Sequence, residues 1–477
     1  MKYIPKLSSF PTSSTYVCKR AEQLKALKER LQKSSLTEEM RTRILSLDIA
    51  ELQKKLKDRS LKAIDVLQAY QYKALEAQEE TNCLIAVIPE AEELALKCDS
   101  LPSVIKPLHG IPISLKENII YKGLYSTNGL GSKLLNPPSA HDSNLVKCLK
   151  ELGAVPFVTT NVPQTLMSIS CDNNIYGQTR NPHKADRCPA GSSGGEAALI
   201  GYGGSILGIG SDIGGSIRCP AHFCGIYGLK TTITRVGTGS LSIAAEKQDL
   251  IHPSIGPMAQ TADGLIIAAK ALFSKNVFEM DPRIAPIEFQ NHLFEGKKNL
   301  RIGYYVTDNT VSSIPACRRA VLMAKKALEA KGHTVVEFTP PRILYALCLA
   351  SRILWLDGRR LSNMVKHEPP SKELFFLRIT ENFAKILASL LYFIDNTSYQ
   401  ILCSLDGSRK YRQIYSLVAE KEKYDKEFAD AMQKDKLDAL ICPVMSSTSL
   451  LIKCSNFGIN SRQCWTPSQC PGCCSYI

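Results

Sequence analysis

The sequence predicts an α/β fold in which α-helices sandwich a mixed, largely buried β-sheet. Short apolar runs typical of strands alternate along the chain with longer amphipathic runs typical of helices. Hydrophobic residues make up 44% and charged residues 22% of the 477 residues, a composition that allows a sizeable buried core. Large α/β enzymes often place a chain of this length around one sheet.

The first 60 residues are predicted to be helical. Residues 17–58 are charged, with apolar residues recurring at helical spacing, and a further helix is expected over residues 61–80. We therefore expect an N-terminal helical segment over 1–60, an α/β domain over 61–446 and a tail over 447–477. The tail has no periodicity, which indicates little regular structure.

Helices and strands alternate through the predicted α/β domain. Strands over Ile111–Leu115 and Val155–Thr160 flank a helix that Asp142 caps and that runs to Gly153. The second half is expected to contain a helix from Thr261 to about Ser274, a strand over Leu300–Val306, a helix over Pro315–Lys331 closed by Gly332, a strand over Thr334–Thr339, helices over 342–366 and 411–434, and a last strand over Ala439–Val444.

No window of the sequence holds the roughly 18 consecutive apolar residues that span a bilayer. The most apolar run, Ala197–Gly210, is too short and too rich in glycine. Phe375–Ile394 is also strongly apolar, and it fits either a helix lying in a membrane interface or a buried core helix. Because Met1–Pro5 is not followed by an apolar stretch, we expect no secretory signal and a body facing the cytosol.

The formal net charge of +14 is compatible with nucleic acid, with an anionic membrane surface, or with no specific partner. The basic residues are densest in the first 60 positions, where they alternate with apolar residues at helical spacing. This pattern favours a solvated helix face, so no nucleic-acid partner is predicted.

The chain has 17 cysteines, which we expect to be reduced thiols that mostly pack as small apolar residues. Five of them crowd the end of the chain, at Cys454, Cys464, Cys470, Cys473 and Cys474. The Cys470–Cys473 pair has zinc-site spacing, but a second ligand pair at suitable spacing is missing. The prediction is therefore that the protein holds no metal.

Two glycine-rich stretches carry the chemistry, Ala190–Glu196 and Gly210–Pro220. Glycine at this density is costly in chain entropy, and it suits a site into which backbone N–H groups must point. The peptide nitrogens of Ile213, Gly214, Gly215 and Ser216 are candidates for an oxyanion hole. A serine at the end of such a loop is well placed as a nucleophile.

These glycines have three other interpretations, as a phosphate-binding loop, as a nucleophile elbow or as close packing. A phosphate-binding loop is disfavoured because neither G-x-x-x-x-G-K-[ST] nor a helix-opening G-x-G-x-x-G is present. Gly191–Gly195 formally matches the G-x-S-x-G nucleophile elbow, with Ser193 as nucleophile. That motif requires a preceding strand, and Arg187–Pro189 is a poor one. Close packing of a helix on the sheet would also explain the glycines, and composition alone favours it.

Lys116 favours a catalytic interpretation of these glycine-rich stretches over close packing. It ends the apolar run in Leu108–Asn118, where a lone lysine is usually a solvated charge. Together with the serine pair, however, the segment resembles the amidase signature family. The resemblance implies that Lys116 is the catalytic base, Ser192 the bridging serine of a cis peptide, and Ser216 the nucleophile. It also implies that Ser193 supports the site by hydrogen bonding.

Within that family the chain is most similar to the vertebrate fatty-acid amide hydrolases, from about residue 40 to about residue 446. The segments that carry this narrower resemblance are Thr160–Gln164, Gly177–Pro182, Asp212–Pro220, Phe223–Ile226 and Ile302–Tyr305. The resemblance implies hydrolysis of primary fatty acid amides and N-acylethanolamines without a cofactor, with Leu166 and Met167 lining the acyl pocket. It also implies a homodimer, and peripheral attachment to the cytoplasmic face of intracellular membranes such as the endoplasmic reticulum, or a cytosolic enzyme.

The sequence departs from the family pattern at four places. Ala190 and Gln260 stand where the family usually has glycine and arginine, and the N-terminal membrane helix of animal members is not found. After Val444 the family continues into strands and helices, where this sequence has the cysteine-rich residues 447–477. Two alternatives to an active lipid amidase therefore stay open: a truncated, catalytically inert isoform, and a glutaminase-type amidase of a tRNA-dependent amidotransferase.

Overall fold

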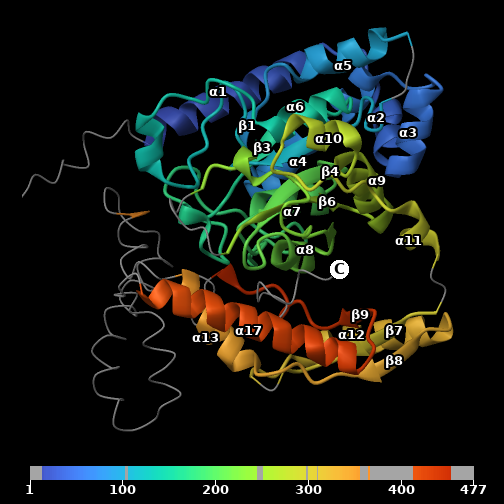
Figure 1. Ribbon diagram of the computed structural model, residues 1–477. Helices are drawn as coiled ribbons and strands as arrows, with labels where there is room; N and C mark the ends of the chain where they lie inside the picture. The colour runs from blue at the N-terminus through green and yellow to red at the C-terminus, as the bar shows by residue number, and fades with distance from the viewer. Residues whose placement is uncertain are drawn as a thin grey trace, which may run out of the picture. The chain divides into compact units, whose positions relative to one another are not determined.

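The computed structural model describes residues 13–102, 106–243, 251–296, 299–308, 310–354, 364–365 and 412–452. Its residues divide into two compact units (Figure 1). The first unit contains the chain up to Asp212, then Ser216–Ala244 and Ser254–Phe289. The second contains Ile213–Gly215, Ala245–Pro253 and the residues from Gln290 onward.

The first unit is built on a six-stranded mixed sheet in the order β1-β3-β2-β4-β6-β5. Its strands are β1 Leu84–Val87, β2 Pro112–Lys116, β3 Val155–Thr160, β4 Leu207–Asp212, β5 Tyr227–Gly228 and β6 Ser254–Ala259. The central strand β2 is parallel to both β3 and β4, whereas β1, β5 and β6 pair antiparallel with their neighbours. Every residue of β2, β3, β4 and β6 is buried, as expected for a sheet covered by helices. The predicted fold class is confirmed.

Helices flank this sheet (Figure 1). They are α1 Ser13–Gln32, α2 Glu38–Leu45, α3 Ile49–Lys57, α4 Ala63–Thr81, α5 Ala91–Ser100, α6 Asn144–Glu151, α7 Gly194–Gly201, α8 Arg218–Cys224, α9 Ala262–Leu272 and α10 Lys275–Met280, with short 3₁₀ turns η2 Gly131–Leu135, η3 Gln164–Leu166 and η4 Thr238–Ser240. Helix α7 contacts β2, β3, β4 and β6 and lies beside α4. It is the element that connects the glycine-rich loop to the centre of the sheet.

Side-chain caps explain several helix starts. The Thr261 side chain accepts a hydrogen bond from the Gly264 backbone and begins α9, as predicted from the sequence. The expected cap of α6 was wrong, because Ser143 and not Asp142 caps that helix. The Asp142 carboxylate instead accepts hydrogen bonds from the Lys122 backbone at 3.0 Å and from Lys150 Nζ at 2.6 Å.

Strands β4 and β6 contain buried glycines, Gly208 and Gly210 in β4 and Gly256 in β6. Glycine is normally unfavourable inside a strand unless another group approaches closely. At Gly208 a side chain would enter the carboxyl group of Glu196, and at Gly256 it would meet the Leu229 carbonyl oxygen. These close approaches explain why each strand has glycine at a buried position and only one β-branched residue, Ile209 in β4 and Ile255 in β6.

The second unit contains a three-stranded parallel sheet in the order β8-β7-β9. Its elements are α11 Asn291–Gly296, β7 Arg301–Tyr304, α12 Pro315–Ala330, β8 Thr334–Glu337, α13 Ile343–Leu354, α17 Arg412–Lys434 and β9 Ala439–Ile441. Helices α13 and α17 pack on each other, and the Phe338 and Phe428 rings meet edge to face at 5.8 Å in its core. All three strands lie inside their predicted ranges but end earlier.

Several predicted segments lie outside the described residues. These are Phe375–Ile394, the end of the expected helix over 342–366, and residues 453–477 of the tail. Within the part of the chain that the structure describes, none of the helices has the length and apolar character that a membrane crossing requires.

The close packing of α7 yields a stability prediction. A side chain on Gly195 would meet the backbone nitrogen and oxygen of Asn161 and the Cys83 oxygen, which cannot rotate away. We expect Gly195→Ala to lower the free energy of unfolding by about 3 kcal/mol. The control is Gly123→Ala, at a position with φ +78° but open space, which should cost about 1 kcal/mol. Urea denaturation measures both, and equal losses would contradict the packing argument.

Candidate active site

The candidate site lies where the parallel strands β2 and β4 end side by side. Lys116 is the last residue of β2, and Asp212 is the last residue of β4. Ligands of open α/β sheets bind beyond the carboxyl ends of the strands. The loop that enters α7 and the turn that follows β4 bring Ser192, Ser193 and Ser216 to the same first unit.

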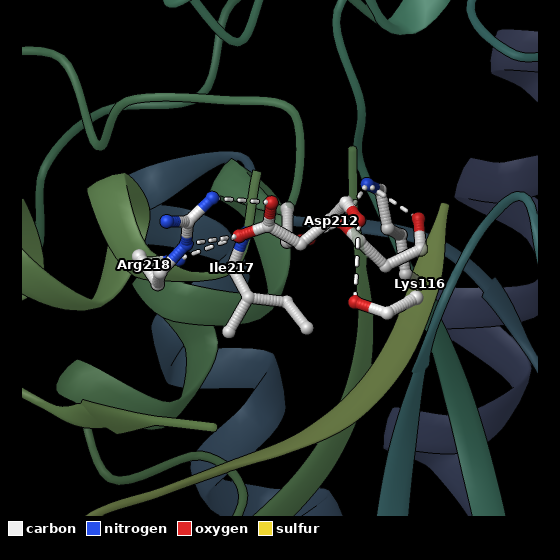
Figure 2. Close-up of polar contacts among 7 residues, drawn as sticks. Lys116, Asp212, Ile217 and Arg218 are labelled. Carbon is white, nitrogen blue, oxygen red and sulfur yellow. Dashed lines mark hydrogen bonds and ion pairs between the residues drawn. The ribbon is translucent and has the colours of Figure 1, made fainter. Parts of the chain in front are cut away.

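Lys116 is completely buried and its amine has three oxygen neighbours. Lys116 Nζ lies 2.7 Å from Ser192 Oγ, 2.9 Å from Ser211 Oγ and 3.1 Å from the Ser211 carbonyl oxygen. Figure 2 shows the amine with dashed contacts to oxygens on either side. The lysine predicted as the base and the serine predicted as the bridge are therefore in direct contact.

Burial controls the charge of this amine. Because the protein interior solvates an ammonium ion poorly, burial lowers the pKa of Lys116 to about 7. The carboxylates of Asp212, Glu117 and Glu196 and the Cys171 thiol act in the opposite direction and do not outweigh burial. A substantial fraction of Lys116 is consequently neutral near pH 7, which is the form that accepts a proton.

The serine loop is held by hydrogen bonds of Ser193. The Gly191–Ser192 peptide bond is cis, and Ser192 is 2% exposed. The Ser193 backbone donates to the Ser216 carbonyl at 3.0 Å, and Ser193 Oγ donates to the Ser211 carbonyl at 3.3 Å. Ser193 is itself fully buried, whereas the nucleophile elbow requires an accessible serine. The geometry thus disfavours Ser193 as nucleophile, while Ser216 is only half-buried.

Asp212 shapes the turn that carries Ser216, a role that sequence reasoning missed. Its buried carboxylate accepts hydrogen bonds from the Ile217 backbone at 3.0 Å and from the Arg218 backbone at 3.3 Å. The Arg218 guanidinium closes the arrangement with two side-chain contacts of 3.0 Å (Figure 2). The signal in the sequence was an Asp and an Arg six positions apart within an otherwise small and apolar segment.

Glu196 holds α7 against the sheet and was also missed. It is completely buried in the first turn of α7, and its carboxylate accepts hydrogen bonds from Ser114 on β2 and from Thr160 on β3, the latter at 2.6 Å. Burial raises the pKa of Glu196 to about 7. Ser114 and Lys116 are two residues apart on β2, so both face the layer that α7 occupies.

The remaining predicted site residues are the candidates for the oxyanion hole and for the acyl pocket. Ile213, Gly214 and Gly215 form the turn after β4, in which Gly215 has a left-handed φ of +116°, and they group with the second unit. Leu166 and Met167 are half-buried at the end of η3. Their roles in binding the oxyanion and the acyl chain stay predictions.

No cluster of three or more potential metal-binding side chains occurs among the described residues, and the Cys470–Cys473 pair lies outside them. Most of the described cysteines are buried, including Cys83, Cys171 and Cys224 near the loop and the start of α7.

The buried lysine predicts a dependence of stability on pH. Because the pKa of Lys116 is lowered in the folded protein, the unfolded chain binds more protons between pH 7 and the ordinary lysine range. The contribution of Lys116 to the free energy of unfolding therefore rises with pH through this window. Lys116→Met should remove that part of the slope in urea titrations from pH 7 to 10. An unchanged slope in the variant would contradict a neutral buried lysine.

Comparisons with known proteins agree on one family. The amidase family model matches residues 65–458. Fatty-acid amide hydrolase 1 of Sus scrofa is 37% identical over 422 residues, covering 87% of this chain and 72% of its own length. Vitamin D3 hydroxylase-associated protein of Gallus gallus is 43% identical over 316 residues, covering 66% and 68%.

Solved structures show the same relationship. A fatty acid amide hydrolase superposes with a TM-score of 0.77 at 26% identity, covering 100% of this chain and 78% of that one. An amidase crystal structure at 21% identity and a TM-score of 0.67 shares the fold, with coverage of 90% and 91%. From the matched family model and these relatives together, the chain belongs to the amidase signature family of amide hydrolases.

Proposed function

We propose that this chain hydrolyses fatty acid amides, both primary amides and N-acylethanolamines, through Lys116, Ser192 and Ser216. The observation that carries the proposal is the buried contact of 2.7 Å between Lys116 Nζ and Ser192 Oγ. A lysine with a pKa of about 7 in this position is suited to general-base work near neutral pH. The names of the relatives from Sus scrofa and Caenorhabditis elegans, both fatty-acid amide hydrolase 1, support the substrate class.

The proposed first half-reaction forms an acyl-enzyme. Neutral Lys116 accepts the proton of Ser192, which accepts the proton of Ser216 while Ser216 Oγ bonds to the amide carbonyl carbon. When the carbon–nitrogen bond breaks, Ser192 gives a proton to the leaving amine and regains one from Lys116. Water then attacks the ester, its proton follows the same route, and the fatty acid leaves with the Ser216 hydroxyl restored.

Backbone donors and apolar side chains complete the proposed site. The peptide N–H groups of residues 213–216 immediately precede or include the nucleophile, and we assign them to the developing oxyanion. Leu166 and Met167 are assigned to the acyl chain. For the whole protein we propose a homodimer attached peripherally to the cytoplasmic face of intracellular membranes, or a cytosolic enzyme.

Covalent labelling tests the nucleophile. Purified protein should react with a fluorophosphonate probe, and Ser216→Ala should abolish the adduct. Lys116→Ala should slow labelling by about 100-fold or more, because it removes the base. Ser100→Ala, on the exposed end of α5, is the matched control and should label like the parent. Labelling that persists in Ser216→Ala would contradict the assignment, and no labelling of compact parent protein would favour the inert alternative.

Substrate profiling tests the acyl group and the amine. We expect kcat/KM for oleamide and for an N-acylethanolamine to exceed that for acetamide by about 100-fold or more, because burial of a long chain adds binding energy. Preference for acetamide would indicate a short-chain amidase, like the named acetamidase of Aspergillus oryzae, which is 34% identical. Turnover of glutamine would favour the glutaminase-type alternative.

A further inference from the structure

We infer that Ser211, held in turn by Asn118, is a positioning residue that aims the nitrogen lone pair of Lys116 at Ser192. The inference rests on the proposed function, because it concerns how the base of that reaction is held. Neither residue carries a role in the proposed proton transfers. Both are buried, at 5% and 3% exposure, so their polar groups must find partners inside the protein.

The contacts around the amine define its directions. Ser211 approaches Lys116 Nζ with two separate oxygens, the hydroxyl at 2.9 Å and the carbonyl at 3.1 Å. Ser192 Oγ supplies the third neighbour at 2.7 Å. An amine nitrogen has four tetrahedral directions, and one of them is the bond to its own side chain. Three oxygens are therefore available for the three remaining directions.

The number of hydrogens on the Lys116 amine explains the role of Ser211. A neutral lysine has two N–H groups and one lone pair, whereas the ammonium form has three N–H groups. The Ser211 carbonyl can only accept a hydrogen bond. If the Ser211 hydroxyl also accepts one, both N–H groups are used and the lone pair points at Ser192. If that hydroxyl donated instead, it would occupy the lone pair and Lys116 could not take the Ser192 proton.

Asn118 offers the Ser211 hydroxyl proton an acceptor other than Lys116. Its amide oxygen lies 3.3 Å and its amide nitrogen 3.2 Å from Ser211 Oγ. When the amide oxygen accepts the Ser211 proton, Ser211 Oγ is left with lone pairs facing Lys116. Asn118 follows Lys116 by two residues, just beyond the end of β2, so one strand end presents both the base and the group that orients its partner.

The same frame serves both charge states of the base. After Lys116 accepts the Ser192 proton, its three N–H groups donate to Ser192 Oγ, Ser211 Oγ and the Ser211 carbonyl without any atom moving to a new partner. Preorganised partners of this kind avoid reorganisation during the reaction. Ser211 therefore stabilises the ammonium form and also directs the neutral form.

The titratable groups whose charges act on Lys116 remain in place in the test variants. They are Asp212 on β4, Glu117 beyond β2, Glu196 on α7 and the Cys171 thiol. A shift in the pH dependence caused by changing Ser211 is therefore assigned to its hydrogen bond and not to a lost charge.

The test measures kcat/KM for oleamide from pH 5 to pH 10 in the full-length protein. Ser211→Ala should lower the plateau by about tenfold or more. It should also move the acidic limb to lower pH by about one unit, because the ammonium form loses an acceptor. Ser211→Thr keeps the hydroxyl and should restore both. A purely structural role would lower activity or folding yield without moving the limb.

A double-mutant cycle tests the contribution of Asn118. Asn118→Ala should lower the plateau in the parent protein, because the Ser211 hydroxyl is then free to donate to Lys116. In the Ser211→Ala background the same change should have little further effect. Additive losses, or an unmoved limb in Ser211→Ala, would overturn the inference while leaving the proposed function intact. Failure of the proposed function would appear separately, as a parent protein that does not turn over oleamide or that does so without Ser216.

Discussion

The burial of one amine at the end of β2 is the constraint on which the site depends. An ammonium ion in the interior is costly unless charges or hydrogen bonds compensate it. Here the carboxylates of Asp212, Glu117 and Glu196 do so only in part, and the pKa of Lys116 falls to about 7. The two oxygens of Ser211 accept hydrogen bonds from Lys116 in either charge state, whereas Ser192 Oγ accepts one only from the ammonium form. The strand that places the lysine, the cis serine loop and the turn after β4 can all be understood as parts that hold this amine.

The glycine-rich segments combine two roles that were alternatives in the sequence analysis, close packing of a helix on the sheet and the formation of a catalytic loop. Gly195 and Gly208 permit backbone or carboxyl groups to approach, so part of the segment is indeed explained by close packing of α7 on the sheet. That packing has a chemical consequence, because α7 begins directly after Ser192 and Ser193. Gly215 differs, since its φ of +116° is one that side chains rarely permit. Packing glycines therefore position the serine loop, and a conformational glycine precedes Ser216.

Sequence patterns predicted the elements with ordinary composition and missed those built around specific contacts. β3 and α12 were found from apolar runs and caps. Lys116 was singled out by the resemblance to the amidase signature family, because a lone lysine at the end of an apolar run is usually a solvated charge. β4 and β6 were not found, because each has only one β-branched residue, Ile209 or Ile255, beside glycine. The roles of Glu196 and Ser211 could not be predicted, because their hydrogen-bond partners are brought close only by folding. These partners are Ser114 and Thr160 for Glu196, and Lys116 and Asn118 for Ser211. Asp142 was mistaken for a cap because it precedes Ser143, which performs that role.

The proposed chemistry requires Lys116 to be neutral in a substantial fraction of molecules near pH 7. Nuclear magnetic resonance of protein carrying ¹³C-labelled lysine side chains measures this directly, with Lys116→Met used to identify the resonance. We expect the Lys116 signal to titrate with a midpoint near pH 7. A midpoint close to that of ordinary exposed lysines would contradict it, since Lys116 would then carry a charge at neutral pH and could not act as the base.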